Sequence, residues 1–446
     1  MREKIKKQLP LMKPTVDHPH ADEMKRIGKI LDENPIITDL AYQDFIGDRD
    51  IKKSGKKGMT AEQVVRAAII KQMNEFSYEE LAFHMVDSAS YRHFCRIGIG
   101  EKGFKASTLC ENIKFLSAKT WEAINRAIIS YAKEKGIEKG RKVRCDCTVV
   151  ASNIHDPSDS SLLWDCVRVI TRMLERAKEK IDQITFTDHT KRAKRRMLGI
   201  LNAKSKGERR DRYKDILKVS AKTLGYAEQA IRVLAHSGDW ELMAMANELK
   251  HYKELTQKVI DQTERRVISG ETVPASEKIV SIFEPHTDII VKDRRDTFYG
   301  HKVCLTSGKS NLIVDCVVLD GNPADSTLTD QMLDRQKEIY GRHPLKVAFD
   351  GGFASKDNLA SAKQRGIKDV CFSKKRGMEV EDMCRSEWVF KGLRRFRAGI
   401  ESGISWIKRC FGFGKCTWKG CRSFKSYIWA SIVSANLLTL ARQKTS

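Results

Sequence analysis

Apolar positions repeat with helical spacing in the N-terminal part of the chain. From Thr60 onward, short periodic segments begin with capping boxes, in which Ser or Thr is followed three residues later by Glu or Gln. The expected helix starts are Thr60 with Gln63, Ser77 with Glu80 and Thr108 with Glu111. Residues 1–58 are polar, with one expected helix at about 21–34, and end in the linker-like KKSGKKG. The pattern therefore predicts a polar segment, 1–58, and a helical domain, 59–138.

The periodicity changes at KVRCDCTVVAS, residues 142–152, where a short β-branched run predicts a buried strand. Residues from about 160 to 275 return to long, highly charged helices. After Pro285, two apolar runs, YGHKVCLTS and NLIVDCVVLDG, are joined by GKS and predict a β-hairpin. The other expected elements are a helix at 325–341, a strand at LKVAFDGG, a helix near 356–365, a strand at KDVCFS and a helix around Glu401.

Without the helical segment, the expected order is strand, strand, strand, helix, strand, helix, strand, helix. This order predicts an α/β fold in which a mixed sheet is flanked by helices, with a helical insertion after the first strand. We expect this domain at residues 139–446, with the insertion at about 160–275. The all-α domain before it fits two structures equally well: a helix-turn-helix DNA module, or a bundle that packs or dimerises.

The charge balance indicates a polyanionic partner. The chain has 82 Lys and Arg against 58 Asp and Glu, a formal net charge of +24, and nucleic acid is the leading candidate. Residues 189–222 alone hold thirteen Lys or Arg against three acids. Such a run is often a solvated helix face, but in so basic a chain it also fits phosphate contact. We therefore expect Arg195 and Arg196 to bind DNA.

Apolar runs and cysteines favour a cytoplasmic location. No apolar run follows the basic residues of MREKIKKQLP, which argues against a signal peptide. The stretch YIWASIVSANLLTLA is too short and too rich in Ser and Asn to span a bilayer, so we expect no membrane partner. The twelve Cys include no CxxC pair, which favours reduced thiols over a zinc site.

Three carboxylates stand out by their positions. Asp146 lies in the middle of a strand, Asp350 lies where an apolar strand ends in DGG, and Glu401 lies on a helix. Carboxylates on two buried strands are costly unless they are paired or hold a hard cation. We expect Mg²⁺, with Mn²⁺ as an alternative. Three such acids would suit two-metal phosphoryl transfer.

The helix around Glu401 has one apolar face and one charged face. The apolar positions are Phe396, Ile400, Ile404, Ile407 and Phe411, and the charged ones are Arg394, Arg397, Glu401 and Lys408. Taken alone, Glu401 also fits an ordinary ion pair with Arg397, which stabilises a helix by only a few tenths of a kcal/mol. Each of Gly399 and Gly403 costs about 1 kcal/mol relative to Ala, which indicates that something comes close to this helix. If that something is the substrate, Arg394, Arg397 and Lys408 would hold its phosphates.

Other acids and histidines offer weaker candidates. Asp315, Asp320 and Asp325 are alternatives to Asp350, which we rank first because of its Gly-Gly context. Helix capping is the expected role of three further acids: Asp156, Asp159 and Asp165. Structural or phosphate-side roles are expected for His155 and His301.

Four stretches together resemble the DDE transposases of bacterial insertion sequences, whose catalytic domain has the ribonuclease H-like fold. The stretches are DCTVVASNIHDPSDSSLLWD, YGHKVCLTSGKSNLIVDCVVLDGNPADS, VAFDGGFAS and RFRAGIESGISWIKRCFG. The family's common Arg, Glu and Lys spacing is met by Arg397, Glu401 and Lys408. Phe353 and Arg394 stand where the family usually has Tyr. Residues 60–135 also resemble the helical N-terminal domain of such transposases.

The resemblance implies a metal-dependent enzyme that uses Asp146, Asp350 and Glu401. It implies binding to the terminal inverted repeats of an insertion sequence, strand cleavage, and transfer of the 3′ ends into target DNA by a homodimer. It also implies a bacterial cytoplasmic protein that joins the nucleoid when bound to DNA. Two alternatives are a related metal-dependent nuclease without strand transfer and a non-enzymatic DNA-binding regulator.

Overall fold

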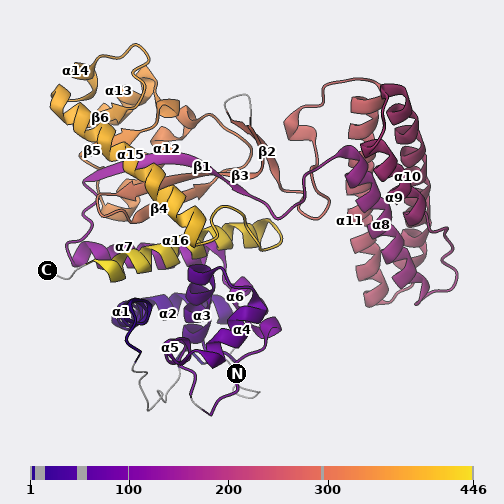
Figure 1. Cartoon of the computed structure of the whole chain (residues 1–446), viewed down its shortest axis with the longest axis horizontal. Helices are drawn as coiled ribbons and strands as arrows, with labels where there is room; N and C mark the ends of the chain where they lie inside the picture. The colour runs from indigo at the N-terminus through magenta and orange to yellow at the C-terminus, as the bar shows by residue number, and fades with distance from the viewer. Residues whose placement is uncertain (1–2, 6–15, 48–57, 99, 293–295, 444–446) are drawn as a thin grey trace. The chain divides into compact units, whose positions relative to one another are not determined.

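The computed structural model describes residues 3–5, 16–47, 58–98, 100–292 and 296–443. The chain divides into two compact units, of which the first is Met1–Ala151 with His301–Ser446 and the second is Ser152–Gly300. Each unit is described by itself below (Figure 1). The expected linker, residues 52–57, lies outside the described residues.

The first unit begins with helices that share one apolar core. They are α1 (Pro19–Glu33), α2 (Pro35–Ile46), α3 (Ala61–Asn74), α4 (Tyr78–Asp87), α5 (Ala89–Phe94), α6 (Ala106–Phe115) and α7 (Ala118–Glu134). Capping boxes at Thr60 and Ser77 start α3 and α4, as expected. The third expected start is wrong, because α6 begins after Lys105 and Thr108 lies in its first turn. The helix α2 was not expected, although its buried Ile37 and Ala41 belong to the same core as α1.

A mixed sheet has six strands among the described residues. They are β1 (Lys142–Ala151), β2 (Asp288–Lys292), β3 (Asp296–Gly308), β4 (Ile313–Val318), β5 (Lys346–Phe349) and β6 (Asp369–Phe372). The order is β2-β3-β1-β5-β6, and β4 pairs with β3. The pairs β1–β5 and β5–β6 are parallel, whereas β2–β3 and β3–β4 are antiparallel. The predicted α/β class and the predicted hairpin are confirmed, and β2 is an additional strand.

Helices on the first unit's sheet follow the expected pattern. Short 3₁₀ turns at Asp325–Leu328 and Gly351–Phe353 accompany α12 (Thr329–Tyr340), α13 (Lys356–Gln364), α14 (Val380–Met383), α15 (Glu387–Cys410) and α16 (Cys421–Arg442). Helix α15 lies across β1, β5 and β6 (Figure 1). Its predicted apolar face is confirmed, since Ile400, Ile404 and Ile407 are buried. This packing fixes which side of α15 faces the strand ends.

The apolar stretch near the end of the chain lies in α16, which packs against α3, α7 and β4. Almost every residue of α16 is buried, including Asn436, whose side chain donates to the carbonyl of Ile313 and to Asn125. A helix that is apolar on all sides is typical of burial inside a large domain. None of the helices that the structure describes is long and apolar enough to cross a bilayer.

The second unit is a helical bundle with its own apolar core. It contains α8 (Asp159–Lys178), α9 (Thr190–Leu201), α10 (Lys206–Ala235) and α11 (Trp240–Thr263), followed by a π-helical turn at Glu264–Ile268 and a 3₁₀ turn at Ala275–Glu277. The expected return to helix after the first strand is therefore confirmed. The hairpin of β2 with residues 296–300 of β3 also belongs to this unit.

Candidate active site

The register of two parallel strands brings Asp146 and Asp350 together. Cys145 of β1 lies opposite Phe349 of β5, so Asp146 and Asp350 are the next residues along adjacent strands. Neighbouring strands lie about 4.8 Å apart, and residues in register point to the same face of a sheet. The two carboxylates therefore leave the sheet side by side, where β5 ends.

Three groups hold the Asp350 carboxylate. Ser373, directly after β6, donates its hydroxyl to Oδ1 at 2.9 Å. Arg397 of α15 donates from Nη1 to the same oxygen. Burial by itself would raise the pKa of Asp350, but bonds from the Gly351 N–H and Ser373, together with the charge of Arg397, hold the pKa below its ordinary value. Asp350 is therefore fixed in the ionised form.

Arg397 links Asp350 to Glu401. Its Nη1 is ion-paired with Asp350, and its Nη2 is ion-paired with Glu401 one turn further along α15. The ordinary helix ion pair expected for Glu401 is therefore present. The same guanidinium also reaches the end of β5, which a surface ion pair on an isolated helix would not do. Arg397 is largely buried, whereas Glu401 is 58% exposed.

Asp146 has a different environment from the other two acids. Burial and then the negative charge of Asp350 raise the pKa of Asp146 to about 6, with a smaller contribution from Glu401. The charge of Arg397 and the Cys147 N–H, which donates to Oδ1 at 2.8 Å, oppose this rise. The three carboxylates thus lie close enough to influence one another, and one of them lacks a full counter-charge.

The oxygen ligands of these acids are of the kind that hard divalent cations prefer. In the described part of the chain, no three His, Cys, Asp or Glu side chains are gathered closely enough to hold a metal ion as they stand. At this site Arg397 is ion-paired with both Asp350 and Glu401. The donor set therefore fits a divalent cation, provided that Arg397 gives up at least one of its carboxylates.

An open cleft of about 450 Å³ borders the acids. Asp146 and Glu401 line it together with Lys408 and Arg409 of α15. Cations on the wall of a cleft that also holds carboxylates suit a substrate that carries phosphates. Arg394 is exposed one turn before Arg397, on the same helix. The structure thus gathers Asp146, Asp350, Glu401, Arg397 and Lys408 around one place.

The basic residues expected in the helical insertion lie on α9 of the second unit. Arg195 is exposed there. Arg196 is ion-paired with Asp215 of α10, together with Arg192. Arg196 therefore already has a carboxylate partner within the protein, and Arg195 is the residue of the two with no ion pair among those the structure describes.

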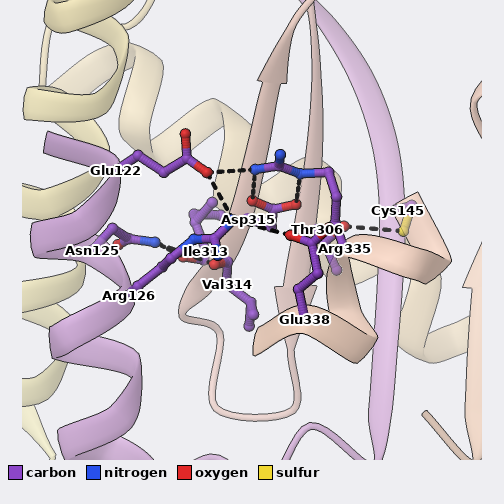
Figure 2. A network of polar contacts seen from close by, with 10 residues as sticks. All are labelled: Glu122, Asn125, Arg126, Cys145, Thr306, Ile313, Val314, Asp315, Arg335 and Glu338. Carbon is purple, nitrogen blue, oxygen red and sulfur yellow. Dashed lines mark hydrogen bonds and ion pairs between the residues drawn. The ribbon is translucent and has the colours of Figure 1, made fainter. Parts of the chain in front are cut away.

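Asp315, the first alternative to Asp350, is already paired in the interior. It is 1% exposed on β4, and both of its oxygens accept from Arg335, each at 2.6 Å. Arg335 also donates to Glu122 of α7 at 2.8 Å. Figure 2 shows this network between the helix α7 and the sheet, with Asn125 donating to the carbonyls of β4. Through Arg335, Asp315 therefore links β4 to Glu122 of α7.

The remaining acids also have structural partners. Asp325 is ion-paired with Lys302 at 2.5 Å, and Asp320 lies 3.7 Å from Lys425. The expectation that Asp159 and Asp165 cap a helix is wrong, because Ser158 caps α8. Asp159 is instead ion-paired with Arg266, and Asp165 with Arg168.

The two histidines weighed in the sequence also have structural neighbours. His155 lies 3.8 Å from Asp165, in the second unit. His301 has an edge-to-face contact with Phe424.

Two further residues shape the site and were not predicted. Ser373 holds Asp350, and its only sequence signal is the run SKKRG that follows β6. Arg144, two residues before Asp146, donates to the carbonyl of Phe396 and to Asn311, each at 2.6 Å, and stacks on the Phe396 ring. Arg144 therefore fastens α15 to β1.

Gly399 and Gly403 were expected to mark a close approach to α15. A Cβ at position 399 would collide with the guanidinium of Arg144, so the expectation is confirmed there. At position 403 no described protein atom lies within 4 Å of a Cβ, so the close approach expected there stays a prediction. The first glycine thus permits the contact between α15 and β1.

Comparison with known protein families gives two matches. Residues 285–437 match the family described as Transposase DDE domain, and this range contains Asp350 and Glu401. Residues 14–114, which include α1 to α6 except the end of α6, match the family described as Transposase domain (DUF772). No curated protein and no solved structure matched the chain.

Proteins with a DDE transposase domain are DNA-binding enzymes of transposition that use divalent metal ions. The match lies on the strands β3 to β6 and on α15, the elements that carry two of the three acids and Arg397. The chain therefore carries a Transposase DDE domain, with a DUF772 transposase domain ahead of it.

Proposed function

We propose that this transposase binds the terminal inverted repeats of an insertion sequence, cleaves DNA strands there, and transfers the 3′ ends into target DNA. The observation that carries the proposal is that Asp146 and Asp350 directly follow the paired residues Cys145 of β1 and Phe349 of β5, and so lie side by side. Glu401 is connected to the same place through Arg397. Asp146 and Glu401 also line an open cleft together with Lys408 and Arg409.

In this proposal Asp146, Asp350 and Glu401 hold the divalent cations, with Mg²⁺ as the expected ion and Mn²⁺ as the alternative. Bound in pairs, such ions activate a water or a 3′-hydroxyl for in-line attack and stabilise the leaving oxygen. The raised pKa of Asp146 supports this assignment, because neighbouring carboxylates are stabilised by added positive charge. Among the residues that the structure describes, Asp146 has no ion pair of its own, and the charge of Arg397 only partly opposes the rise in its pKa.

The cations of α15 have the complementary role. Lys408 lines the cleft beside Asp146 and Glu401, and Arg394 is exposed one turn before Arg397. Once Arg397 is released from a carboxylate, its planar guanidinium can bind a phosphate through two N–H groups. We propose that these three cations position the DNA backbone, which fixes the scissile phosphate without reading sequence.

The test is a cleavage assay with Mg²⁺ on DNA that carries the ends of the element bracketing this gene. Asp146→Asn, Asp350→Asn and Glu401→Gln should each abolish strand cleavage. Asp320→Asn is the control, because that acid is exposed and lies outside the cleft. Near-wild-type cleavage by any of the three variants would overturn the assignment.

The products of the same assay separate strand transfer from simpler functions. A transposase joins the cut 3′ ends to a second DNA, so joined product is expected. Cut DNA without joined product would identify a nuclease instead. Unaltered DNA that is bound equally well with and without Mg²⁺ would identify a regulator.

We further propose that the protein acts as a homodimer on DNA, in the bacterial cytoplasm and on the nucleoid. Both element ends must be held together for paired cutting and joining, which one copy with a single cleft of this kind does not explain. The mass of the protein–DNA complex, measured by light scattering, tests the dimer. One copy per pair of ends would contradict it.

A further inference from the structure

Helix α9 of the second unit carries its cations on two separate stripes. Arg192 and Arg196, one turn apart, are both ion-paired with Asp215 of α10. Lys191 and Lys194 lie on another side of α9, where they line a groove together with residues of α8. The carboxylate of Asp215 thus partly offsets the charge of the first stripe, whereas the two lysines of the second line the groove.

The groove between α8 and α9 has a volume of about 330 Å³, and cations make up half of its lining residues. Arg168 and Arg172 come from α8, and Lys191 and Lys194 come from α9. Glu175 is the acid in the lining. Arg168 is additionally paired with Asp165 at 2.6 Å. The other three cations form no ion pair within the described residues.

The ring of Trp164, which lines the groove, contacts one cation from each helix. Its ring lies 5.0 Å from the guanidinium carbon of Arg168 and 6.0 Å from Nζ of Lys194. A cation held over an indole ring is attracted by its π-electrons, so Trp164 restrains one charge from each helix. The charges are thereby gathered over a rigid aromatic surface on a folded bundle.

Like charges that face one another across a groove repel, and this repulsion is relieved when an anion lies between them. Arg172, Lys191 and Lys194 are opposed by the single acid Glu175. We propose that this groove binds the sugar–phosphate backbone of DNA, as a contact independent of base sequence. DNA is the polyanion that fits a transposase of net charge +24, and the inference rests on the proposed function in that respect.

The test compares two double variants of the same helix and the same charge change. Lys191→Gln with Lys194→Gln removes the groove charges, and Arg192→Gln with Arg196→Gln removes the paired ones. Binding to a duplex with the element's end, and to one of scrambled sequence, is measured by fluorescence anisotropy without Mg²⁺. Salt is varied between about 50 and 200 mM, where phosphate contacts dominate the change in affinity.

The groove variant should weaken binding to both duplexes equally, by about tenfold, and lower the slope of log K against log salt by about 1 for each lost phosphate contact. The control variant should keep the wild-type affinity and slope. Circular dichroism melts must show that both variants are folded. Arg172→Lys, which preserves charge, should also keep the wild-type slope, because a phosphate contact does not need a particular cation.

The inference would be overturned if both double variants lost the same amount of DNA affinity, or if the groove variant bound DNA as tightly as the wild-type protein. If the groove variant binds DNA with the affinity and salt dependence of the wild-type protein, the groove does not contact DNA, and an acidic protein surface would be the remaining partner. Failure of the proposed function gives another result, namely wild-type protein that binds DNA but does not cut it with Mg²⁺. The two failures are therefore distinguishable.

Discussion

Arg397 is ion-paired with both Asp350 and Glu401, so one guanidinium joins the end of β5 to the helix α15. In this arrangement one positive charge is shared between two of the three proposed metal ligands. The contact holds the acids in place before a metal binds, and it competes with that metal for the same oxygens. The consequences can be separated by measuring metal binding and catalysis independently.

Arg397→Gln should bind Mg²⁺ more tightly than the wild-type protein and should cleave DNA more slowly. The competing charge is removed from two carboxylates, while a proposed phosphate contact is lost. Metal binding is read from the rise in Tm with added Mg²⁺, since a ligand of the native state stabilises it in proportion to ln(1 + [L]/Kd). Arg394→Gln is the control on the same helix and should leave metal affinity unchanged. Weaker Mg²⁺ binding by Arg397→Gln would mean that Arg397 supports the ions instead of competing with them.

Asp146 should make the fold less stable as the pH rises. Its pKa is about 6 in the folded protein, against about 3.9 for an unfolded Asp, so the folded state binds more protons between these values. The free energy of unfolding therefore falls as pH rises from about 4 to about 6, by about 3 kcal/mol at most. Asp146→Asn should raise Tm at about pH 8 in EDTA and leave it little changed at about pH 4.

The exposed Asp320→Asn serves as the control for that measurement and should change Tm at neither pH. An Asp146→Asn protein with an unchanged Tm at the higher pH would show that the burial of Asp146 has no energetic consequence. Added Mg²⁺ should raise the Tm of the wild-type protein more than that of Asp146→Asn, because one ligand oxygen is lost.

Asp315 should be far more important for stability than for catalysis. Removing one partner of a buried ion pair leaves the other charge uncompensated and costs about 3–5 kcal/mol. Asp315→Asn should therefore lower the free energy of unfolding by several kcal/mol, measured by urea titration. Replacing both partners, Asp315→Leu with Arg335→Met, should recover much of the loss. Stability near that of the wild-type protein in Asp315→Asn would contradict the network in Figure 2.

Much of the sheet could be predicted because its strands are short apolar runs. The strand β5 is recognisable from LKVAF, and the Asp that follows it is marked by Gly-Gly. The buried face of α15 is recognisable from its helical period. The start of α6 was mispredicted because the capping sequence of Thr108 and Glu111 lies inside the helix, which begins at Ala106.

The connections between the acids could not be read from the sequence. Arg397 was expected beside Glu401, four residues away, but its bond to Asp350 depends on how α15 crosses β5. The same holds for Arg144 and Asn311, which are far apart in sequence and meet at α15. Sequence periodicity describes one element at a time, whereas these contacts arise from the packing of two or three.

Gly399 and Gly403 on α15 should respond in opposite ways to the same substitution. Gly403→Ala places a methyl group in open space and should stabilise the protein by about 1 kcal/mol through helix propensity. Gly399→Ala forces Arg144 away from the carbonyl of Phe396 and from Asn311, and charge-assisted bonds of this kind contribute about 1.5–3 kcal/mol each. Gly399→Ala should therefore lower the free energy of unfolding, although Ala has a higher helix propensity than Gly.

A double-mutant cycle in urea tests whether Arg144 is the cause. In an Arg144→Ala background no guanidinium remains to be displaced, so Gly399→Ala should become stabilising, as Gly403→Ala is in the wild-type protein. The coupling between positions 144 and 399 should then be about 2 kcal/mol or more. Equal effects of Gly399→Ala in both backgrounds would show that Arg144 does not hold α15 against β1. In that case the position of Glu401 beside Asp146 and Asp350 would depend on apolar packing and on Arg397.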